Sequence, residues 1–413
     1  MKILYLSHRV PFPPNKGEKI RTFHQIEYLL QKGHEVTVIS PYEESAEVPY
    51  FTELKSQYGV NVHSFRLPPK LLRLMSGFVQ GKALSVANFS SADLQKGLDK
   101  LLDEHEFSAL VCTASSMAEY VFKSQAKVIR DKKLRLFMDF MDLDSDKWRQ
   151  YAQRSSLPMK LLYSRERNLI STLEVQVAAH FNTCFFITET EVALFKEGAP
   201  DLGDICAIEN GIDTVGFCPP DAPRFRESPI LLFTGVMNYS PNVDAVLWFV
   251  ENVWKDIVHI WPSAEFIIAG MDPTEKIIAL GNMRGITVTG FVDDIKPYFN
   301  RANVFVAPFR IARGVQNKVL QAFACGLPVI STPMGAEGIR CSDNQSILLA
   351  EKSSDFVLQL EKLFQFPDHY TRIANNALQL IHQHYTWESI LNPFEKKLSM
   401  NQADSFSTSQ TDK

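Results

Sequence analysis

The sequence has none of three features that would each indicate a function class directly. Its six cysteines are scattered among 413 residues without a C-x-x-C pair, which favours reduced thiols over a disulfide framework or a zinc site. No stretch approaches the ~18 apolar residues that a membrane-spanning helix needs. The fingerprint G-x-G-x-x-G is missing after the first strand, so we do not expect a dinucleotide site there.

A strong excess of charge of one sign is also missing. The chain has 43 Lys and Arg residues, 47 Asp and Glu residues and a net charge of −4, which argues against a general nucleic-acid binder. The first strand-like run meets His8 and Arg9 too early for the apolar region of a secretory signal. We therefore expect a cytoplasmic protein, either soluble or peripheral on the cytoplasmic face of the inner membrane.

The residues that are present predict an α/β protein. A length of 413 residues with 45% hydrophobic and 22% charged residues is typical of a soluble chain with two to three domains. Residues 2–7 predict a buried parallel strand, 18–31 a helix that ends near Gly33, and 35–40 a second strand. Strand, loop, helix and strand form the opening of a Rossmann-like unit.

Several aspartates follow the strand predicted over 135–140. Ligands of α/β proteins bind beyond the carboxyl ends of parallel strands, so Asp142 and Asp144 are candidate catalytic or sugar-orienting residues. An equally weighted alternative is the acidic start of a helix, because Asp and Ser are good N-caps. We expect no metal site here, since no His lies nearby and the Gly and distal Glu of an EF-hand loop are absent.

The stretch over 303–332, NVFVAPFRIARGVQNKVLQAFACGLPVIST, organises the rest of the chain. It predicts a strand over 304–309, a polar loop, a helix that opens near Asn317 and a second strand over 328–331. A helix N-terminus attracts anions, cationic side chains suit a diphosphate, and glycine allows close approach of the backbone. The alternative is a βαβ crossover with solvated cations. The candidate ligands of a diphosphate and its sugar are Arg310, Arg313, Gly314, Lys318 and Gln321.

This stretch resembles the nucleotide-sugar motif of retaining glycosyltransferases of family 4, which have the GT-B architecture. The end of that motif is intact from Ala324 to Ile330, whereas Arg313 and Gln321 stand at its two acidic positions. The segments 137–152, 233–246 and 312–320 resemble a branch of that family, the sugar transferases associated with PEP-CTERM/exosortase exopolysaccharide clusters. In that branch the first acidic position is commonly Arg, but Gln321 is a departure.

The resemblance implies two Rossmann-like domains that face each other across a cleft, with a C-terminal helix that crosses back to the first domain. The predicted boundaries are 1–210 for the acceptor-side domain, 211–229 for a linker, 230–384 for the nucleotide-sugar domain, 385–400 for the crossing helix and 401–413 for a disordered tail.

The resemblance also adds site residues. It places the loop with Lys16 and Gly17 at the cleft, where Lys16 is a catalytic candidate, although a solvated loop is the alternative. Asn238 lies in a glycine loop that in most relatives precedes an Arg and a Lys, both missing here. Val292 lies in the segment whose backbone contacts the nucleotide base in the family.

The function implied is metal-independent transfer, with retention, of a sugar from a nucleotide-sugar donor to a glycan or lipid-linked glycan. No cofactor besides the donor is implied. The basic, amphipathic segment 67–83 either lies on the inner-membrane surface or packs on its own domain. Two alternatives stay open: a degenerate GT-B scaffold without transferase activity, and a nucleotide-sugar epimerase.

Overall fold

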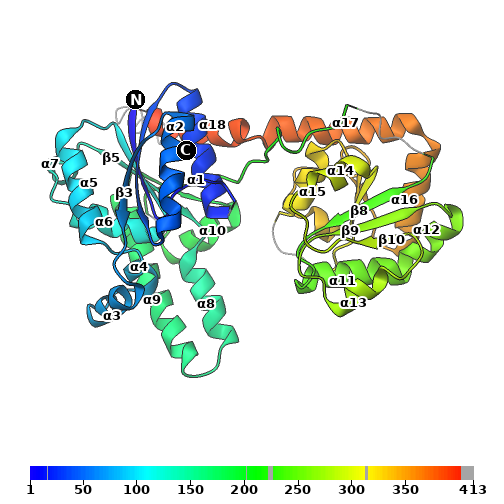
Figure 1. The fold of residues 1–413 in the computed structure, drawn as a ribbon, viewed down its shortest axis with the longest axis horizontal. Coiled ribbons are helices and arrows are strands. Elements are labelled where there is room, and N and C mark those ends of the chain that lie inside the picture. The colour runs from blue at the N-terminus through cyan, green and yellow to red at the C-terminus, as the bar shows by residue number, and fades with distance from the viewer. Residues whose placement is uncertain (16, 201, 222–226, 312–314, 401–413) are drawn as a thin grey trace. The chain divides into compact units, whose positions relative to one another are not determined.

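A computed structural model describes residues 1–15, 17–200, 202–221, 227–311 and 315–400. The chain forms two compact units, one of residues 1–210 with the segment that begins at Ile390, and one of residues 211–389. Each unit has one parallel sheet with helices packed on it (Figure 1). This confirms the predicted α/β class and the two Rossmann-like sheets of a GT-B protein.

The sheet of the first unit has seven strands in the order β3-β2-β1-β4-β5-β6-β7. The strand order changes direction between β1 and β4, which is the position where open α/β sheets bind ligands. Most of its inner strands are buried along nearly their whole length, as expected when helices cover both faces of a parallel sheet. The strands are β1 (Lys2–Ser7), β2 (Glu35–Tyr42), β3 (Asn61–Arg66), β4 (Ala109–Thr113), β5 (Arg135–Met141), β6 (Thr183–Phe186) and β7 (Asp204–Ala207).

The helices of the first unit fall before, between and after these strands. They are α1 (Gly17–Gln31), η1 (Ser45–Glu47), α2 (Val48–Tyr58), α3 (Lys70–Val79), α4 (Leu84–Ala87), α5 (Ala92–Glu104), η2 (Ser115–Met117), α6 (Ala118–Lys123), α7 (Lys127–Arg130), α8 (Asp144–Arg154), α9 (Met159–His180) and α10 (Glu189–Gly198). In Figure 1, α8 and α9 form a helical hairpin that extends away from the sheet, with α3 and α4 beside its base.

The sheet of the second unit has six strands in the order β10-β9-β8-β11-β12-β13, so its change of direction lies between β8 and β11. Its core is aromatic near this point, where the rings of Phe233 and Phe305 stack with their centroids 6.5 Å apart. The strands are β8 (Ile230–Thr234), β9 (Glu265–Ala269), β10 (Ile286–Val288), β11 (Val304–Ala307), β12 (Val329–Ser331) and β13 (Leu348–Leu349).

The helices of the second unit follow the same alternation with the strands. They are α11 (Ser240–Phe249), η3 (Val250–Trp254), α12 (Lys255–Ile260), α13 (Glu275–Leu280), α14 (Lys296–Arg301), α15 (Asn317–Ala324), η4 (Pro333–Ala336), α16 (Ser353–Gln365) and α17 (Pro367–His384). The predicted helix start near Asn317 is correct, whereas β11 ends at Ala307, two residues before the predicted strand end.

The last helix, α18 (Trp387–Ser399), brings the chain back to the first unit. Phe394 packs on Phe185 of β6, with the ring centroids 5.1 Å apart, and Lys397 Nζ lies 2.7 Å from Asp204 Oδ2. Among the helices that the structure describes, none has both the length and the apolar content to cross a bilayer.

Candidate functional site

The segment that joins β11 to α15 lies at the point where the strand order of the second sheet changes direction. This position is where sequence analysis placed the diphosphate, and it is the ligand position of open α/β sheets. Two of the predicted ligands, Arg313 and Gly314, lie outside the described residues. Lys318, in the first turn of α15, is therefore the predicted ligand whose surroundings are best defined.

The amine of Lys318 is enclosed by neutral groups. Its Nζ donates a hydrogen bond to Asn242 Oδ1 at 2.7 Å and lies 4.8 Å and 5.0 Å from the ring centroids of Phe233 and Phe309. Burial lowers the pKa of Lys318 to about 7, and among the described residues no carboxylate is paired with it. An approaching anion would restore the charged form and would bind to it strongly.

Two glycines at the strand ends make room for this amine. Gly235 follows β8 with a φ of +155°, and a Cβ there would lie 2.8 Å from Lys318 Nζ and 2.6 Å from Asn242 Nδ2. Gly270 follows β9 with a φ of +147°, and a Cβ there would lie 1.7 Å from the carbonyl oxygen of Gly235. Side chains at either position would displace the backbone or the lysine, so glycine is required at both.

Two hydrogen bonds fix the orientation of the Asn242 side-chain amide. Its Nδ2 donates to the carbonyl oxygen of Val236 at 2.9 Å, which leaves Oδ1 to accept from the lysine. Asn242 is buried on α11, and the sequence analysis did not select it. Its role depends on a contact across 76 positions in the chain, which local sequence patterns do not reveal.

The other described residues among the predicted ligands of the second unit have no hydrogen bond or ion pair with Lys318 or Asn242. Arg310 is exposed and pairs with Asp244, where Nε lies 3.0 Å from Oδ2. Gln321 lies one turn after Lys318 on α15 and is half-buried. Asn238 is exposed in the loop before α11, and Val292 is half-buried after β10. Their roles toward a donor stay predictions.

In the first unit, Asp142 and Asp144 lie beyond the carboxyl end of β5, as predicted. Asp142 is exposed, while Asp144 is the first residue of α8. The structure thus confirms the acidic helix start, and the catalytic or sugar-orienting role of both residues stays a prediction. Asp144 Oδ2 accepts a hydrogen bond from Ser115 Oγ at 3.3 Å, and burial raises the pKa of Asp144. Of the first predicted loop, Lys16 lies outside the described residues and Gly17 is exposed at the start of α1.

Two carboxylates that the sequence analysis did not select hold this aspartate loop in place. Glu191 Oε1 accepts from the backbone N–H of Leu143 at 3.0 Å, and Glu174 Oε1 accepts from that of Ser145 at 3.0 Å. Burial raises the pKa of Glu174 to about 7. Both residues come from helices remote in sequence, and only the Thr188–Glu191 capping box of α10 left a recognisable pattern.

His8 is a further polar residue at the same edge of the sheet. It follows β1 directly, is buried, and its Nδ1 lies 3.3 Å from Thr113 Oγ1 at the end of β4. Burial lowers the pKa of His8 to about 4, so its imidazole is neutral at physiological pH. The signal that was available is its position, because a histidine right after the first strand of a Rossmann-like sheet lies at the ligand-binding edge.

Comparisons with known proteins bear on the family and the fold. Residues 228–365 match the family described as glycosyl transferases group 1. An uncharacterised 44.6 kDa protein from the cps region of Klebsiella pneumoniae is 20% identical, over 96% of this chain and 99% of that protein. The family match confirms the enzyme class predicted from the sequence.

Similar solved structures cover nearly the whole chain at low identity. Sucrose-phosphate synthase from Thermosynechococcus elongatus aligns with a TM-score of 0.59 and 14% identity over 99% of this chain and 100% of that one. Anabaena HepE in complex with UDP aligns with a TM-score of 0.61 and 15% identity over 97% and 100%. TarM, of which a Staphylococcus aureus form was also solved with UDP, aligns with a TM-score of 0.63 and 12% identity over 97% and 99%. The match to the glycosyl transferases group 1 family thus lies within the second unit, and the chain has the GT-B fold.

Proposed function

We propose that this protein transfers a sugar from a nucleotide-sugar donor to a hydroxyl group of an acceptor, with retention and without a metal ion. The second unit binds the donor and the first unit binds the acceptor. The group 1 domain supports the donor site, and the fold is shared with HepE, which was solved with UDP. In the transfer, the acceptor oxygen forms a bond to the sugar C1 while the bond between C1 and the phosphate oxygen breaks. The electron pair of the broken bond leaves with the nucleoside diphosphate, whose phosphate oxygen takes up the proton of the acceptor hydroxyl.

The observation that carries this proposal is the environment of Lys318. Its amine belongs to the first turn of α15 and lies beside Gly235, and its partners are an amide oxygen and two aromatic rings. The ammonium form and the N–H groups of the first turn of α15 would stabilise the negative charge that develops on the leaving diphosphate. A metal ion is not required for that role when a preorganised cation performs it.

For the acceptor, we propose a glycan or lipid-linked glycan that lies near Asp142 and Asp144. Carboxylates accept hydrogen bonds from sugar hydroxyls, and Asp144 is held in place by Ser115. The relative encoded in a cps region supports an extracellular polysaccharide as the product, in agreement with the exopolysaccharide branch that the sequence resembles. An acceptor carried on a lipid would require the protein to work at the cytoplasmic surface of the inner membrane.

One observation favours a second candidate, a GT-B scaffold without activity. The two acidic positions of the family motif hold Arg313 and Gln321, and a neutral amide replaces a carboxylate near the donor. Loss of one charged hydrogen bond costs about 1.5–3 kcal/mol, which is roughly a ten- to hundredfold change in affinity or rate. An enzyme would survive that change with reduced activity, whereas a scaffold would have no donor site at all.

Thermal-shift measurements with UDP-, GDP-, ADP- and dTDP-sugars test the proposal, because a donor that binds the native state raises the melting temperature. The Gln321→Glu variant sharpens the test. We expect one donor class to bind, and the variant to increase donor hydrolysis or transfer about ten- to hundredfold. Failure of both forms to bind any donor would favour the scaffold. Conversion of the donor without an acceptor, and without release of the nucleotide, would indicate an epimerase.

A further inference from the structure

Helix α3 turns its apolar face toward solvent. Leu71, Leu72, Met75, Phe78 and Val79 recur at the spacing of one helical face, and each is between 55% and 86% exposed. A surface helix normally turns such a face toward the core of its own domain. A contiguous exposed patch of this kind marks a surface on which something docks.

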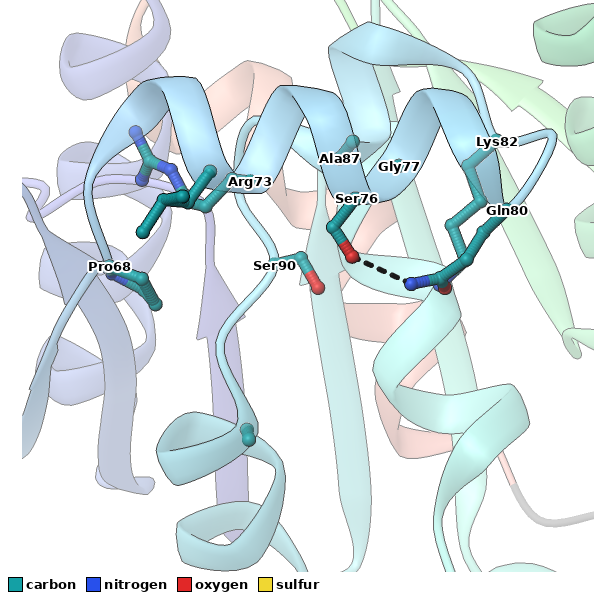
Figure 2. A pocket seen from close by; sticks show the side chains of 10 residues that line it. Pro68, Arg73, Ser76, Gly77, Gln80, Lys82, Ala87 and Ser90 are labelled. Carbon is teal, nitrogen blue, oxygen red and sulfur yellow. Dashed lines mark hydrogen bonds between the residues drawn. The ribbon is translucent and has the colours of Figure 1, made fainter.

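The opposite side of α3 explains why the helix lies in this orientation. Arg73 is 4% exposed and donates from Nη2 to Glu43 Oε1 at 2.7 Å. Gly77 allows close packing on α4, since a Cβ there would lie 2.1 Å from the Cβ of Ala87. Figure 2 shows the pocket along the side of the helix, which Leu72 and Arg73 also line and where the exposed Gln80 donates from Nε2 to Ser76 Oγ at 2.8 Å. The orientation is therefore fixed by the inward-facing residues, and the apolar face stays outside.

A second apolar group lies at the turn between α8 and α9, where Leu157, Met159 and Leu161 are exposed. Arg165 of α9 connects this hairpin to α3. Its guanidinium carbon lies 4.9 Å from the ring centroid of Phe78, and Nη2 donates to the carbonyl oxygen of Lys82 at 2.9 Å. We call the apolar side chains of α3 and of this turn, with the basic residues around them, the docking surface.

The segments that form the docking surface are rich in basic residues, of which Arg73, Lys82, Arg149 and Arg165 are paired with Glu43, Glu119, Asp146 and Glu166. The segment 66–92 has four basic residues and no acidic one, and 147–165 has five basic residues and no acidic one. The whole chain, in contrast, has a net charge of −4. Among the basic residues, Lys70, Arg154 and Lys160 are exposed beside the apolar side chains. A surface that is both apolar and basic repels a second copy of itself and attracts an anionic lipid headgroup layer.

We propose that the docking surface binds the protein to a bilayer that contains anionic phospholipid. The apolar side chains of α3 and the hairpin turn enter the boundary between headgroups and acyl chains. The basic side chains remain at the level of the phosphates, where each adds attraction that falls off within a Debye length. This inference does not rest on the proposed transfer reaction, since no donor or acceptor is involved in the binding.

Sedimentation of the full chain with vesicles tests the proposal. We expect binding to mixed phosphatidylcholine and phosphatidylglycerol vesicles, and binding that is about tenfold or more weaker to phosphatidylcholine alone. The double variant Leu72→Gln with Val79→Gln should reduce binding to the mixed vesicles about tenfold or more. A second double variant, Lys70→Gln with Lys160→Gln, should reduce binding and its salt dependence together.

A matched control is available on the second unit. Val215→Gln with Ile278→Gln also replaces two exposed apolar side chains, and Val215 is 89% exposed, close to the 86% of Val79. This control should bind like the unchanged chain, and all variants should melt at the same temperature because every changed residue is exposed. Absence of binding to the mixed vesicles, or equal binding by Leu72→Gln/Val79→Gln, would overturn the proposal. A dimer in lipid-free solution that this variant dissociates would instead assign the surface to a second copy.

Discussion

Each unit contains a largely buried cationic side chain, and the two differ in their partners: Arg21 meets a carboxylate, whereas Lys318 meets neutral groups. Arg21 in the first unit is 1% exposed, and its Nε lies 2.7 Å from Asp139 Oδ2. Its Nη1 also donates to the carbonyl oxygen of Ile208 at 2.6 Å. Lys318 in the second unit meets the amide oxygen of Asn242 instead of a carboxylate. The charge of a buried cation is compensated when its partner is a carboxylate, whereas a buried cation with neutral partners retains affinity for an anionic ligand.

The comparison separates a structural role from a binding role by chemistry alone. Asp139 is fully buried, and it also accepts from the backbone N–H of Met141 at 3.2 Å. Together with Ile208, these contacts join α1, β5 and the segment after β7. Lys318 joins α15 to α11 only through the neutral amide oxygen of Asn242, and Gly235 keeps the space beside its amine open. Three substitutions and one pH titration test whether this distinction holds.

The largest effect is expected from Arg21→Met. It leaves the carboxylate of Asp139 buried without its partner, and breaking such a pair costs about 3–5 kcal/mol of folding free energy. The first unit should therefore unfold at a much lower urea concentration. Arg149→Met is the matched control, because Arg149 pairs with Asp146 in a partly exposed position and should cost less than about 1 kcal/mol. If Arg21→Met unfolds like the unchanged chain, the structural role of Arg21 is wrong.

The next effect is expected from Lys318→Met. The free energy of unfolding should stay the same or increase, because the substitution removes a cation whose burial is unfavourable and is not compensated by a carboxylate. Affinity for UDP should fall roughly ten- to hundredfold, as expected for a charged hydrogen bond of about 1.5–3 kcal/mol. Isothermal titration calorimetry measures this change. The control Lys255→Met removes an exposed lysine of the same unit and should leave the affinity unchanged.

The binding of UDP-glucose should depend on pH through the same lysine. Burial lowers the pKa of Lys318 to about 7, so the free protein loses this proton as the pH rises through 7. A bound diphosphate favours the ammonium form and raises the pKa. Affinity should therefore be constant with respect to this group below pH 7 and fall above it, by up to about tenfold per pH unit. Titrations at several pH values should show this slope in the unchanged chain and none in Lys318→Met. An equal slope in both would assign the titration to another group.

Much of the fold follows from patterns that are local in the sequence. The buried apolar runs of β1, β4 and β8 predict parallel strands, and the polar start of α15 predicts its first turn. The Gly-Leu-Pro turn at Gly326 marks the end of α15 because glycine accepts the left-handed conformation there, with a φ of +68°. Each of these features is determined by a few consecutive residues.

The environment of the site residues could not be predicted in this way. The pKa of Lys318 is lowered by burial, and the residues around its amine, such as Phe233 of β8 and Asn242 of α11, come from other strands and helices. Arg310 looked equally suited to a phosphate, and its pairing with Asp244 depends on how α11 packs beside β11. For α3 the amphipathic pattern was evident, but periodicity does not say which face of a helix is turned inward. Tertiary packing decides all three.

The smallest effect is expected from Arg310→Gln. It tests whether an exposed cation that already has a carboxylate partner contributes to donor binding. Arg310 already has a carboxylate partner in Asp244, and hydrogen bonding to that partner raises the pKa of the guanidinium. An exposed ion pair contributes at most about 1 kcal/mol. UDP affinity should therefore change by less than about fivefold, well below the change for Lys318→Met. A loss as large as that of Lys318→Met would mean that Arg310 leaves Asp244 when the donor binds. In that case Asp244→Asn, which removes the carboxylate partner of Arg310 before UDP binds, should strengthen UDP binding. A carboxylate partner would then not identify an exposed cation as structural.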